Sequence, residues 1–282
     1  MAKILDGRKV AATLKEKMLQ QFSSLKQTVK LTVVHCNDPA SASYLKGRKK
    51  ICEFLGVSLE EIVIDNSTTM EQISAIVNDL NNDYSVDGIM IDRPLPSQLD
   101  ENKVLSLITP SKDVDGYTFP SLGKLLSNQK THNSCTPAAA IYILDYYNID
   151  LAGKNAVVVG RSVNVGKPLA LMLLNKNATV TIAHSKTKDL HKITKKADVI
   201  FTCVGKHNFI KKQHVSKKTI IVDIGINFDE NGKLCGDTAA ECYDYVKAYS
   251  PVPGGVGVIT NLMLMNNLYT AHLLKENNED SL

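Results

Sequence analysis

The stretch Lys154–His184, KNAVVVGRSVNVGKPLALMLLNKNATVTIAH, carries a strand–turn–helix–strand pattern that decides the fold class. KNAVVVG is a β-branched apolar run, LALMLLNKN is typical of a helix, and ATVTIAH predicts the next strand. Gly160 ends the first strand and Gly166 begins the helix, where bare backbone lets a diphosphate approach a helix N-terminus. The stretch therefore predicts a nucleotide-binding α/β unit.

The spacing of the turn is G-x-S-x-x-x-G rather than the common G-x-G-x-x-G. Many strand-to-helix turns need glycine for conformation alone. Taken by itself, the turn supports a purely conformational role for its glycines about as well as a cofactor site.

The end of the second strand favours NADP over NAD. An NAD site usually presents an acidic residue about 20 residues after the glycine turn, whereas this strand continues into AHSKTK. Ser185 and Lys186 offer a hydroxyl and a cation, and Arg161 adds a guanidinium, a set suited to a 2′-phosphate. The alternative is that Lys186 and Lys188 are simply solvated at a helix start.

The pattern continues in both directions from this stretch. On the N-terminal side, helices are expected at 10–25, 43–56, 70–83 and 137–148, with strands at 30–36, 59–64 and 86–92. Residues 93–99 and 109–125 are rich in Pro, Gly and Asp and are expected to form loops. On the C-terminal side, 188–197 predicts a helix, 198–205 and 219–226 predict strands, and 260–276 predicts a final helix. This alternation indicates parallel sheets.

Composition restricts the class of protein. The chain has 282 residues, enough for two domains, and its net charge of +4 is too small and too dispersed to indicate a nucleic-acid partner. The six cysteines show no CxxC spacing, and no stretch has the apolar length of a membrane span or of a cleaved leader, so we expect a reducing, cytoplasmic setting. His35 and His184 lack partners at metal-ligand spacing, which predicts no metal.

Several blocks together resemble one family along nearly the whole chain. They are NDPASASY, RPLP, KDVDGY, CTP, GRSVNVGKP, HSKT, VDIGIN and SPVPGGVGVIT. In order and spacing they are similar to the bifunctional FolD family, methylenetetrahydrofolate dehydrogenase/methenyltetrahydrofolate cyclohydrolase.

The resemblance implies a two-domain α/β fold with a cleft at the domain junction. A folate-binding catalytic domain would span 1–137 and be completed by the C-terminal helix at 260–282, and a Rossmann-like NADP-binding domain would span 138–259. The implied protein is a homodimeric enzyme of one-carbon metabolism that acts on tetrahydrofolate derivatives.

The resemblance also implies roles for individual residues. Tyr44 would stack on the folate beside a catalytic lysine, and Asp115 would bind the pterin. The loop of Pro253, Gly254 and Gly255 would close the cleft over the substrate. The implied cofactor-binding residues are Gly160, Arg161, Ser162, Gly166, Ser185, Lys186 and Ile226. Without the resemblance, Tyr44 would be an ordinary half-buried aromatic and Asp115 a turn-former.

Two positions depart from the family pattern at the catalytic centre. Arg48 stands where the lysine is usual, and Asp92 stands where a glutamine that holds this lysine is usual. Arginine keeps its proton, so we expect it to preserve charge and shape but to impair the proton transfers of the cyclohydrolase step. We also expect Asp92 to accept a bidentate hydrogen bond from Arg48. Lesser departures are Ser121, Asn164 and Val258, where asparagine, an apolar residue and proline are usual.

Three interpretations follow from these departures. The favoured one is an NADP-dependent 5,10-methylenetetrahydrofolate dehydrogenase whose cyclohydrolase activity is weakened. A fully bifunctional enzyme would need another base, either Lys46 or Lys49 from a shifted helix or Asp92 acting through water; helical geometry disfavours the two lysines, which otherwise belong to a solvated face. A folate- and nucleotide-binding protein without catalysis is the third.

Overall fold

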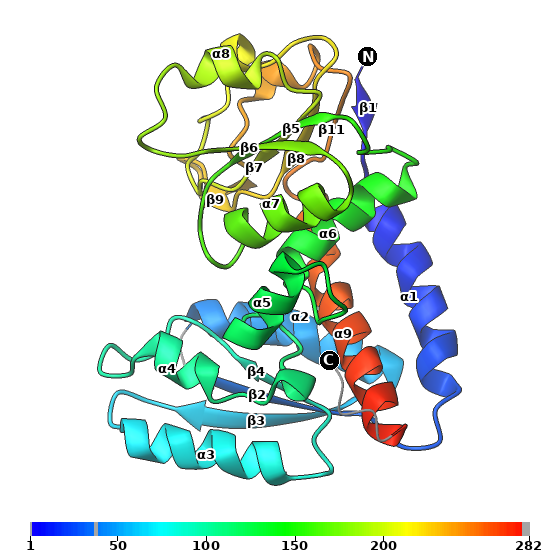
Figure 1. Ribbon diagram of the computed structural model, residues 1–282, viewed down its shortest axis with the longest axis vertical. Coiled ribbons are helices and arrows are strands. Elements are labelled where there is room, and N and C mark those ends of the chain that lie inside the picture. Colours follow the sequence, from blue (N-terminus) through cyan, green and yellow to red (C-terminus); the bar gives the residue numbers. More distant parts are fainter. Residues whose placement is uncertain (1, 37–38, 278–282) are drawn as a thin grey trace. The chain divides into compact units, whose positions relative to one another are not determined.

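The chain divides into two compact units, each built on a parallel sheet. One unit comprises Met1–Thr13 and Ser134–Met263, and the other comprises Leu14–Asn133 and Leu264–Leu282. The computed structural model (Figure 1) describes residues 2–36 and 39–277, with residues 39–44 described by their backbone only. The division falls within helices α1 (Gly7–Ser23) and α9 (Thr260–Glu276).

The first unit contains a six-stranded sheet in the order β1-β11-β8-β7-β5-β6, with parallel pairs throughout. It is called the cofactor unit below, because the sequence predicts that it binds NADP. Helices α7 and α8 lie on opposite faces of this sheet (Figure 1). The strands are β1 (Lys3–Ile4), β5 (Asn155–Val159), β6 (Thr179–Ala183), β7 (Val199–Thr202), β8 (Ile220–Asp223) and β11 (Ala248–Tyr249); β9 (Asn227–Phe228) and β10 (Leu234–Cys235) form a separate antiparallel pair. The helices are α6 (Cys135–Tyr146), α7 (Gly166–Asn175) and α8 (Leu190–Thr194), with short 3₁₀ turns at Lys212–His214, Ala240–Cys242 and Val256–Val258.

Strand β5 lies at the point where the order of this sheet reverses. The chain leaves β5 through α7 to β6 on one side and returns through α8 to β7 on the other. In open α/β sheets, ligands bind outside the carboxyl ends of the strands at such a point. The glycine turn therefore lies where this architecture places a ligand.

The second unit contains a three-stranded parallel sheet in the order β3-β2-β4. It is called the folate-side unit below, because the resemblance implies that this part of the chain binds folate. Helices α2 and α3 lie on its opposite faces (Figure 1), and Ile73, Val77 and Leu80 of α3 pack in its core with Val34 and Ile89. The strands are β2 (Lys30–Cys36), β3 (Ser58–Ile64) and β4 (Gly88–Ile91), and the helices are α2 (Pro39–Leu55), α3 (Met70–Asn82), α4 (Glu101–Ser106) and α5 (Phe119–Leu126), with a 3₁₀ turn at Pro110–Lys112.

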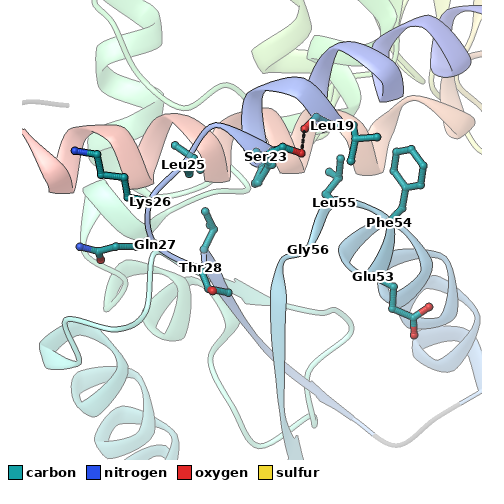
Figure 2. A pocket seen from close by; sticks show the side chains of 12 residues that line it. Leu19, Ser23, Leu25, Lys26, Gln27, Thr28, Glu53, Phe54, Leu55 and Gly56 are labelled. Carbon is teal, nitrogen blue, oxygen red and sulfur yellow. Dashed lines mark hydrogen bonds between the residues drawn. The ribbon is translucent and has the colours of Figure 1, made fainter.

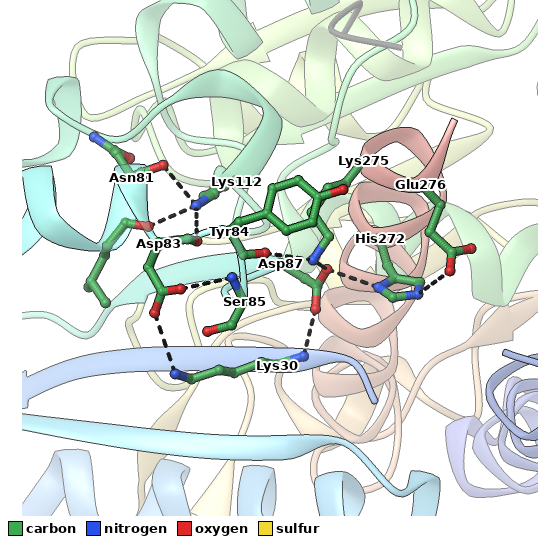
Figure 3. A network of polar contacts seen from close by, with 11 residues as sticks. Lys30, Asn81, Asp83, Tyr84, Ser85, Asp87, Lys112, His272, Lys275 and Glu276 are labelled. Atoms are coloured by element: carbon green, nitrogen blue, oxygen red, sulfur yellow. Dashed lines mark hydrogen bonds and ion pairs between the residues drawn. The ribbon is translucent and has the colours of Figure 1, made fainter. Parts of the chain in front are cut away.

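A buried polar network anchors the end of α9 to this sheet (Figure 3). The Asp87 carboxylate is fully buried; it accepts a hydrogen bond from His272 Nδ1 at 2.9 Å and one from the Lys30 backbone at 2.7 Å, and it contacts the Lys275 ammonium. Lys112 donates to three carbonyl oxygens at the end of α3. Because a buried carboxylate needs such donors, this network fixes where α9 packs.

One expectation about local structure was wrong. Residues 109–125 were predicted to be loop, but α5 occupies Phe119–Leu126. Thr118 caps it by accepting a hydrogen bond from the Ser121 backbone, and Pro120 stands in its first turn, where a missing N–H costs nothing. The proline that suggested a loop is thus part of a helix start.

Candidate functional site

Arg48 and Asp92 form a buried ion pair in the folate-side unit. Arg48 Nη1 and Nη2 donate to the two Asp92 carboxylate oxygens, each at 3.0 Å, and the residues are only 2% and 7% exposed. Arg48 lies on the buried face of α2 with Leu45 and Cys52, and Asp92 directly follows β4. The expected bidentate pair is confirmed. Among the described residues, Arg48 Nε is left without a hydrogen-bond partner.

The neighbouring lysines of α2 face away from this pair. Lys46, Lys49 and Lys50 are exposed, and Lys49 Nζ lies 2.8 Å from a carboxylate oxygen of Glu61 on β3. The helix is therefore not shifted so as to bring Lys46 or Lys49 to the place of Arg48. Tyr44 belongs to α2 one turn earlier, but its side chain lies outside the described part of the chain, and its stacking role stays a prediction.

The loop that carries Asp115 is built on the buried carboxylate of Asp113. This carboxylate accepts hydrogen bonds from the backbone of Gly116, Tyr117 and Thr118, at 2.8–3.1 Å, and from Ser121 Oγ at 2.7 Å. The short Ser121 side chain, where asparagine is usual, thus holds the loop directly.

Asn267 of α9 braces the same loop. Its side-chain amide donates to the carbonyl oxygens of Val114 and Asn133, at 2.9 and 2.8 Å. Sequence reasoning missed both Asp113 and Asn267. The signal for Asp113 was its place two residues before Asp115 in KDVDGY, whereas Asn267 is distant in sequence and gave none.

Arg93 is a further residue that sequence reasoning did not single out. It follows Asp92, its guanidinium lies 4.3 Å from the centre of the Tyr117 ring, and Nη1 lies 3.4 Å from Glu101. Burial lowers the pKa of Arg93, but Tyr117 and Asp115 outweigh this effect and raise it overall. Arg93 therefore stacks over the Tyr117 ring, and its positive charge is stabilised by Asp115, the residue predicted to bind the pterin.

His132 lies close beneath this loop and is buried. Among the described residues, neither ring nitrogen has a hydrogen bond of good geometry. Burial lowers the pKa of His132, and the Asp113 carboxylate offsets only part of that effect. Burial therefore favours the neutral imidazole over its protonated form.

In the cofactor unit, the turn between β5 and α7 leaves no room for a side chain at either of its two glycines. Gly160 has φ of 136°, and a Cβ there would collide with Cys203; a Cβ on Gly166 would collide with the Gly160 carbonyl. Ser162 Oγ accepts hydrogen bonds from the backbone of Val165 and Gly166, at 3.2 and 3.3 Å, and so shapes the turn. The close backbone approach fits a diphosphate at the start of α7.

The predicted 2′-phosphate residues lie at the same sheet edge. Strands β5 and β6 are parallel neighbours, so Arg161 after β5 and Ser185 and Lys186 after β6 emerge at adjacent carboxyl ends, and all three are exposed. Thr187 Oγ1 accepts a hydrogen bond from the His184 backbone and shapes this turn. A hydroxyl and two cations at one edge fit an NADP phosphate. Ile226, after β8, is 53% exposed at the same edge.

The Pro253–Gly255 loop packs against the start of α1 in the cofactor unit. The Gly7 backbone donates to the Gly254 carbonyl at 2.8 Å, and a Cβ on Gly7 would collide with Gly255. Gly254 has φ of 101°, a region that favours glycine. The packing of the loop therefore depends on glycine at positions 7 and 254; the contact of the loop with substrate stays a prediction.

A cavity of about 450 Å³ lies elsewhere in the folate-side unit, between the ends of α1 and α2 (Figure 2). Its described lining includes Leu19, Phe22, Lys26, Glu53 and Phe54 and none of the predicted site residues. Within the described ranges, no group of three or more His, Cys, Asp or Glu side chains could hold a metal ion. The helices among those residues also include none that is long and apolar enough to cross a membrane.

Comparisons with known proteins agree with this geometry. Residues 5–115 match the family described as tetrahydrofolate dehydrogenase/cyclohydrolase, catalytic domain, and residues 134–276 match its NAD(P)-binding domain. The chain is 46% identical to the bifunctional protein FolD of Staphylococcus epidermidis over 98% of each chain, and 43% identical to that of Lachnoclostridium phytofermentans over 95% of this chain and 96% of the relative.

Solved structures give the same result. The bifunctional enzyme FolD, methylenetetrahydrofolate dehydrogenase/cyclohydrolase, from Campylobacter jejuni is similar with a TM-score of 0.94 and 36% identity, over 99% of this chain and 100% of that one. The Trypanosoma brucei enzyme in complex with NADP and an inhibitor is similar with a TM-score of 0.90 and 26% identity, over 98% of each chain.

Proposed function

Because this chain belongs to the tetrahydrofolate dehydrogenase/cyclohydrolase family, we propose that it is an NADP-dependent 5,10-methylenetetrahydrofolate dehydrogenase of one-carbon metabolism in which Arg48 slows the cyclohydrolase step. The single observation that carries the second half of this proposal is the buried bidentate Arg48–Asp92 pair.

The dehydrogenase step requires no proton transfer by a side chain at the reacting carbon. Bound NADP would supply the hydride acceptor for the methylene carbon of the folate, so no side chain has to accept a proton at that carbon. The residues bind and orient: Tyr44 and Asp115 for the folate, and Arg161, Ser185 and Lys186 for the 2′-phosphate. Arg48 keeps a positive charge near the folate without needing to titrate.

The cyclohydrolase step requires proton transfer by the protein, because water attacks the methenyl carbon and protons then move as the ring opens. Arginine stays protonated and cannot accept them. Asp92 is a poor substitute base, since both of its oxygens are already engaged by Arg48. We therefore expect slow hydrolysis rather than the full bifunctional rate.

Two assays of the purified protein test this proposal. The first follows NADPH formation from 5,10-methylenetetrahydrofolate and NADP, and the second follows decay of added methenyltetrahydrofolate against the uncatalysed rate. Rapid NADPH formation with little accelerated decay is the expected result. Equal acceleration of both would mean that another group carries the proton. Stabilisation by both ligands without turnover would favour a binding protein.

The proposal includes a homodimer in the cytoplasm. In the part of the chain that the structure describes, the six cysteines form no disulfide, which suits a reducing compartment. Light scattering coupled to size-exclusion chromatography measures the mass in solution, and a mass near that of one 30.9 kDa chain would contradict the dimer.

A further inference from the structure

Two buried carboxylates at the carboxyl edge of the cofactor unit hold three loops together. Asp237 is fully buried and accepts hydrogen bonds from the backbone of Val204, Gly205 and Lys206, at 2.7, 3.3 and 2.8 Å, and from Asn227 Nδ2 at 3.0 Å. The Asp237 carboxylate thus accepts from four donors, and it joins the segment that follows β7 to the segment that begins β9.

Asp223, at the end of β8, completes the arrangement. It is also fully buried and accepts from Thr202 Oγ1 and from the backbone of Gly225, Asp237 and Thr238, at 2.8–3.0 Å. The loops after β7, β8 and β10 are therefore joined by the same two carboxylates, those of Asp223 and Asp237.

Two glycines show how closely these loops meet. A Cβ on Gly225 would collide with the Asp237 carboxylate, and a Cβ on Gly236 would collide with the Asp223 carboxylate. The backbone of each loop thus lies directly against the carboxylate of the other loop, because a glycine without a side chain stands at the contact. This packing leaves little freedom for the loops to move independently.

The same loops define one side of the predicted cofactor site. Cys203, directly before the segment held by Asp237, lies against Gly160 of the glycine turn. Ile226 stands between Gly225, bound to Asp223, and Asn227, bound to Asp237, and its own side chain is exposed. The 2′-phosphate residues lie instead after β5 and β6, on the other side of the glycine turn.

We propose that Asp237 is a positioning residue for the nicotinamide half of the cofactor: it holds Ile226 and the Val204–Lys206 backbone in the geometry that receives the ring. This inference rests on the proposed NADP-dependent function. Asp237 itself touches no ligand, because it is fully buried and its oxygens face the loops.

The test compares two ligands that share the phosphorylated adenosine end. NADP contains the nicotinamide half, and 2′,5′-ADP lacks it. Calorimetric titration of Asp237→Asn should show NADP binding weakened on the order of tenfold, because one charged acceptor is replaced by a neutral amide. Binding of 2′,5′-ADP should stay within about twofold, since its contacts lie after β5 and β6.

The matched control is Asp229→Asn, a half-buried aspartate in the β9–β10 hairpin that accepts hydrogen bonds from Asn231 and Lys233. It should leave both affinities unchanged. If Asp237→Asn does not fold, Asn227→Ala removes one of the four donors and should weaken NADP binding a few-fold with 2′,5′-ADP unaffected.

If Asp237→Asn weakens binding of both ligands equally, Asp237 supports the fold of the unit rather than the nicotinamide half of the site. If NADP binding is unchanged, Asp237 does not position the cofactor at all. Either result overturns the inference and leaves the proposed function standing. A wild-type protein that binds neither ligand would instead overturn the proposed function.

Discussion

Arg48 on α2 and Asp92 after β4 are joined by two parallel hydrogen bonds of 3.0 Å in the interior of the folate-side unit. Such a fork-to-carboxylate geometry is available to arginine but not to lysine. The two departures from the family pattern therefore compensate each other: the carboxylate neutralises a cation that cannot lose its proton. The structural consequence is a stable pair, and the chemical consequence is the loss of a titratable group.

Exchanging both partners for the family residues should restore proton transfer. We expect Arg48→Lys with Asp92→Gln to raise the cyclohydrolase rate by about tenfold or more, within the range that general acid–base catalysis supplies. The measurement is decay of methenyltetrahydrofolate above the uncatalysed rate. Lys49→Ala is the control and should change nothing; if it abolishes residual hydrolysis, Lys49 is the base. An unchanged rate in the double variant would remove the proton-carrier explanation.

Breaking the pair on one side should destabilise the protein strongly. Asp92→Ala leaves a buried, unpaired guanidinium, which we expect to cost about 3–5 kcal/mol in the free energy of unfolding. Replacing both residues by apolar ones, as in Arg48→Met with Asp92→Leu, should cost much less. Lys49→Ala breaks only the exposed pair with Glu61 and should cost under about 1 kcal/mol. Urea unfolding followed by circular dichroism measures these values; equal costs for Asp92→Ala and Lys49→Ala would contradict the buried pair.

Much of this architecture could be predicted because periodicity and turn chemistry agree locally. The strand at Lys30–Cys36 and the helix at Thr260–Glu276 have the predicted bounds, and the parallel sheets are confirmed. The short strands β1 and β11 were missed, because two residues carry no periodicity and their pairing joins distant parts of the chain.

The residues that hold the loops of the candidate site in place were harder to predict than the residues expected to contact ligands. The Arg48–Asp92 pair could be inferred because two departures fell on positions that touch in the family. Asp113 and Asp237 act through backbone N–H groups of loops, and any residue type supplies such a group, so no pattern of side chains marks them. The brace from Asn267 depends on where α9 packs, which local sequence does not determine.

Preference for NADP should depend on Lys186 more than on its neighbours. Lys186→Ala removes the predicted 2′-phosphate cation, so we expect NADP affinity to fall on the order of tenfold while NAD affinity stays nearly unchanged. Calorimetric titration with both dinucleotides measures this ratio. Lys188→Ala, an exposed lysine two residues on, is the matched control. A similar loss in both variants would indicate a diffuse electrostatic field rather than a phosphate site.

Ser121 should matter for folate through the loop it holds. Ser121→Ala removes the 2.7 Å hydrogen bond to Asp113, and we expect it to raise KM for methylenetetrahydrofolate several-fold while KM for NADP is unchanged. Ser121→Asn, the residue usual in the family, should preserve most of the affinity. The control Ser127→Ala removes an exposed hydroxyl at the end of the same helix. If Ser121→Ala leaves KM for the folate unchanged, the backbone hydrogen bonds to Asp113 are enough to hold the loop that carries Asp115.

His132 predicts a fall in stability as the solution becomes mildly acidic. Its pKa is lowered by burial, so below the ordinary histidine value of about 6.5 the unfolded chain binds a proton that the folded protein does not. The stabilising contribution is therefore complete above that pH and is lost as pH falls toward the folded-state pKa. His214, also lowered by burial, adds to the slope. The chain has no tryptophan, so urea unfolding between pH 7.5 and 5.5 is best followed by circular dichroism. His132→Gln should flatten this dependence, and the exposed control His207→Gln should not; an unchanged slope in His132→Gln would mean that burial of this imidazole does not make stability depend on pH.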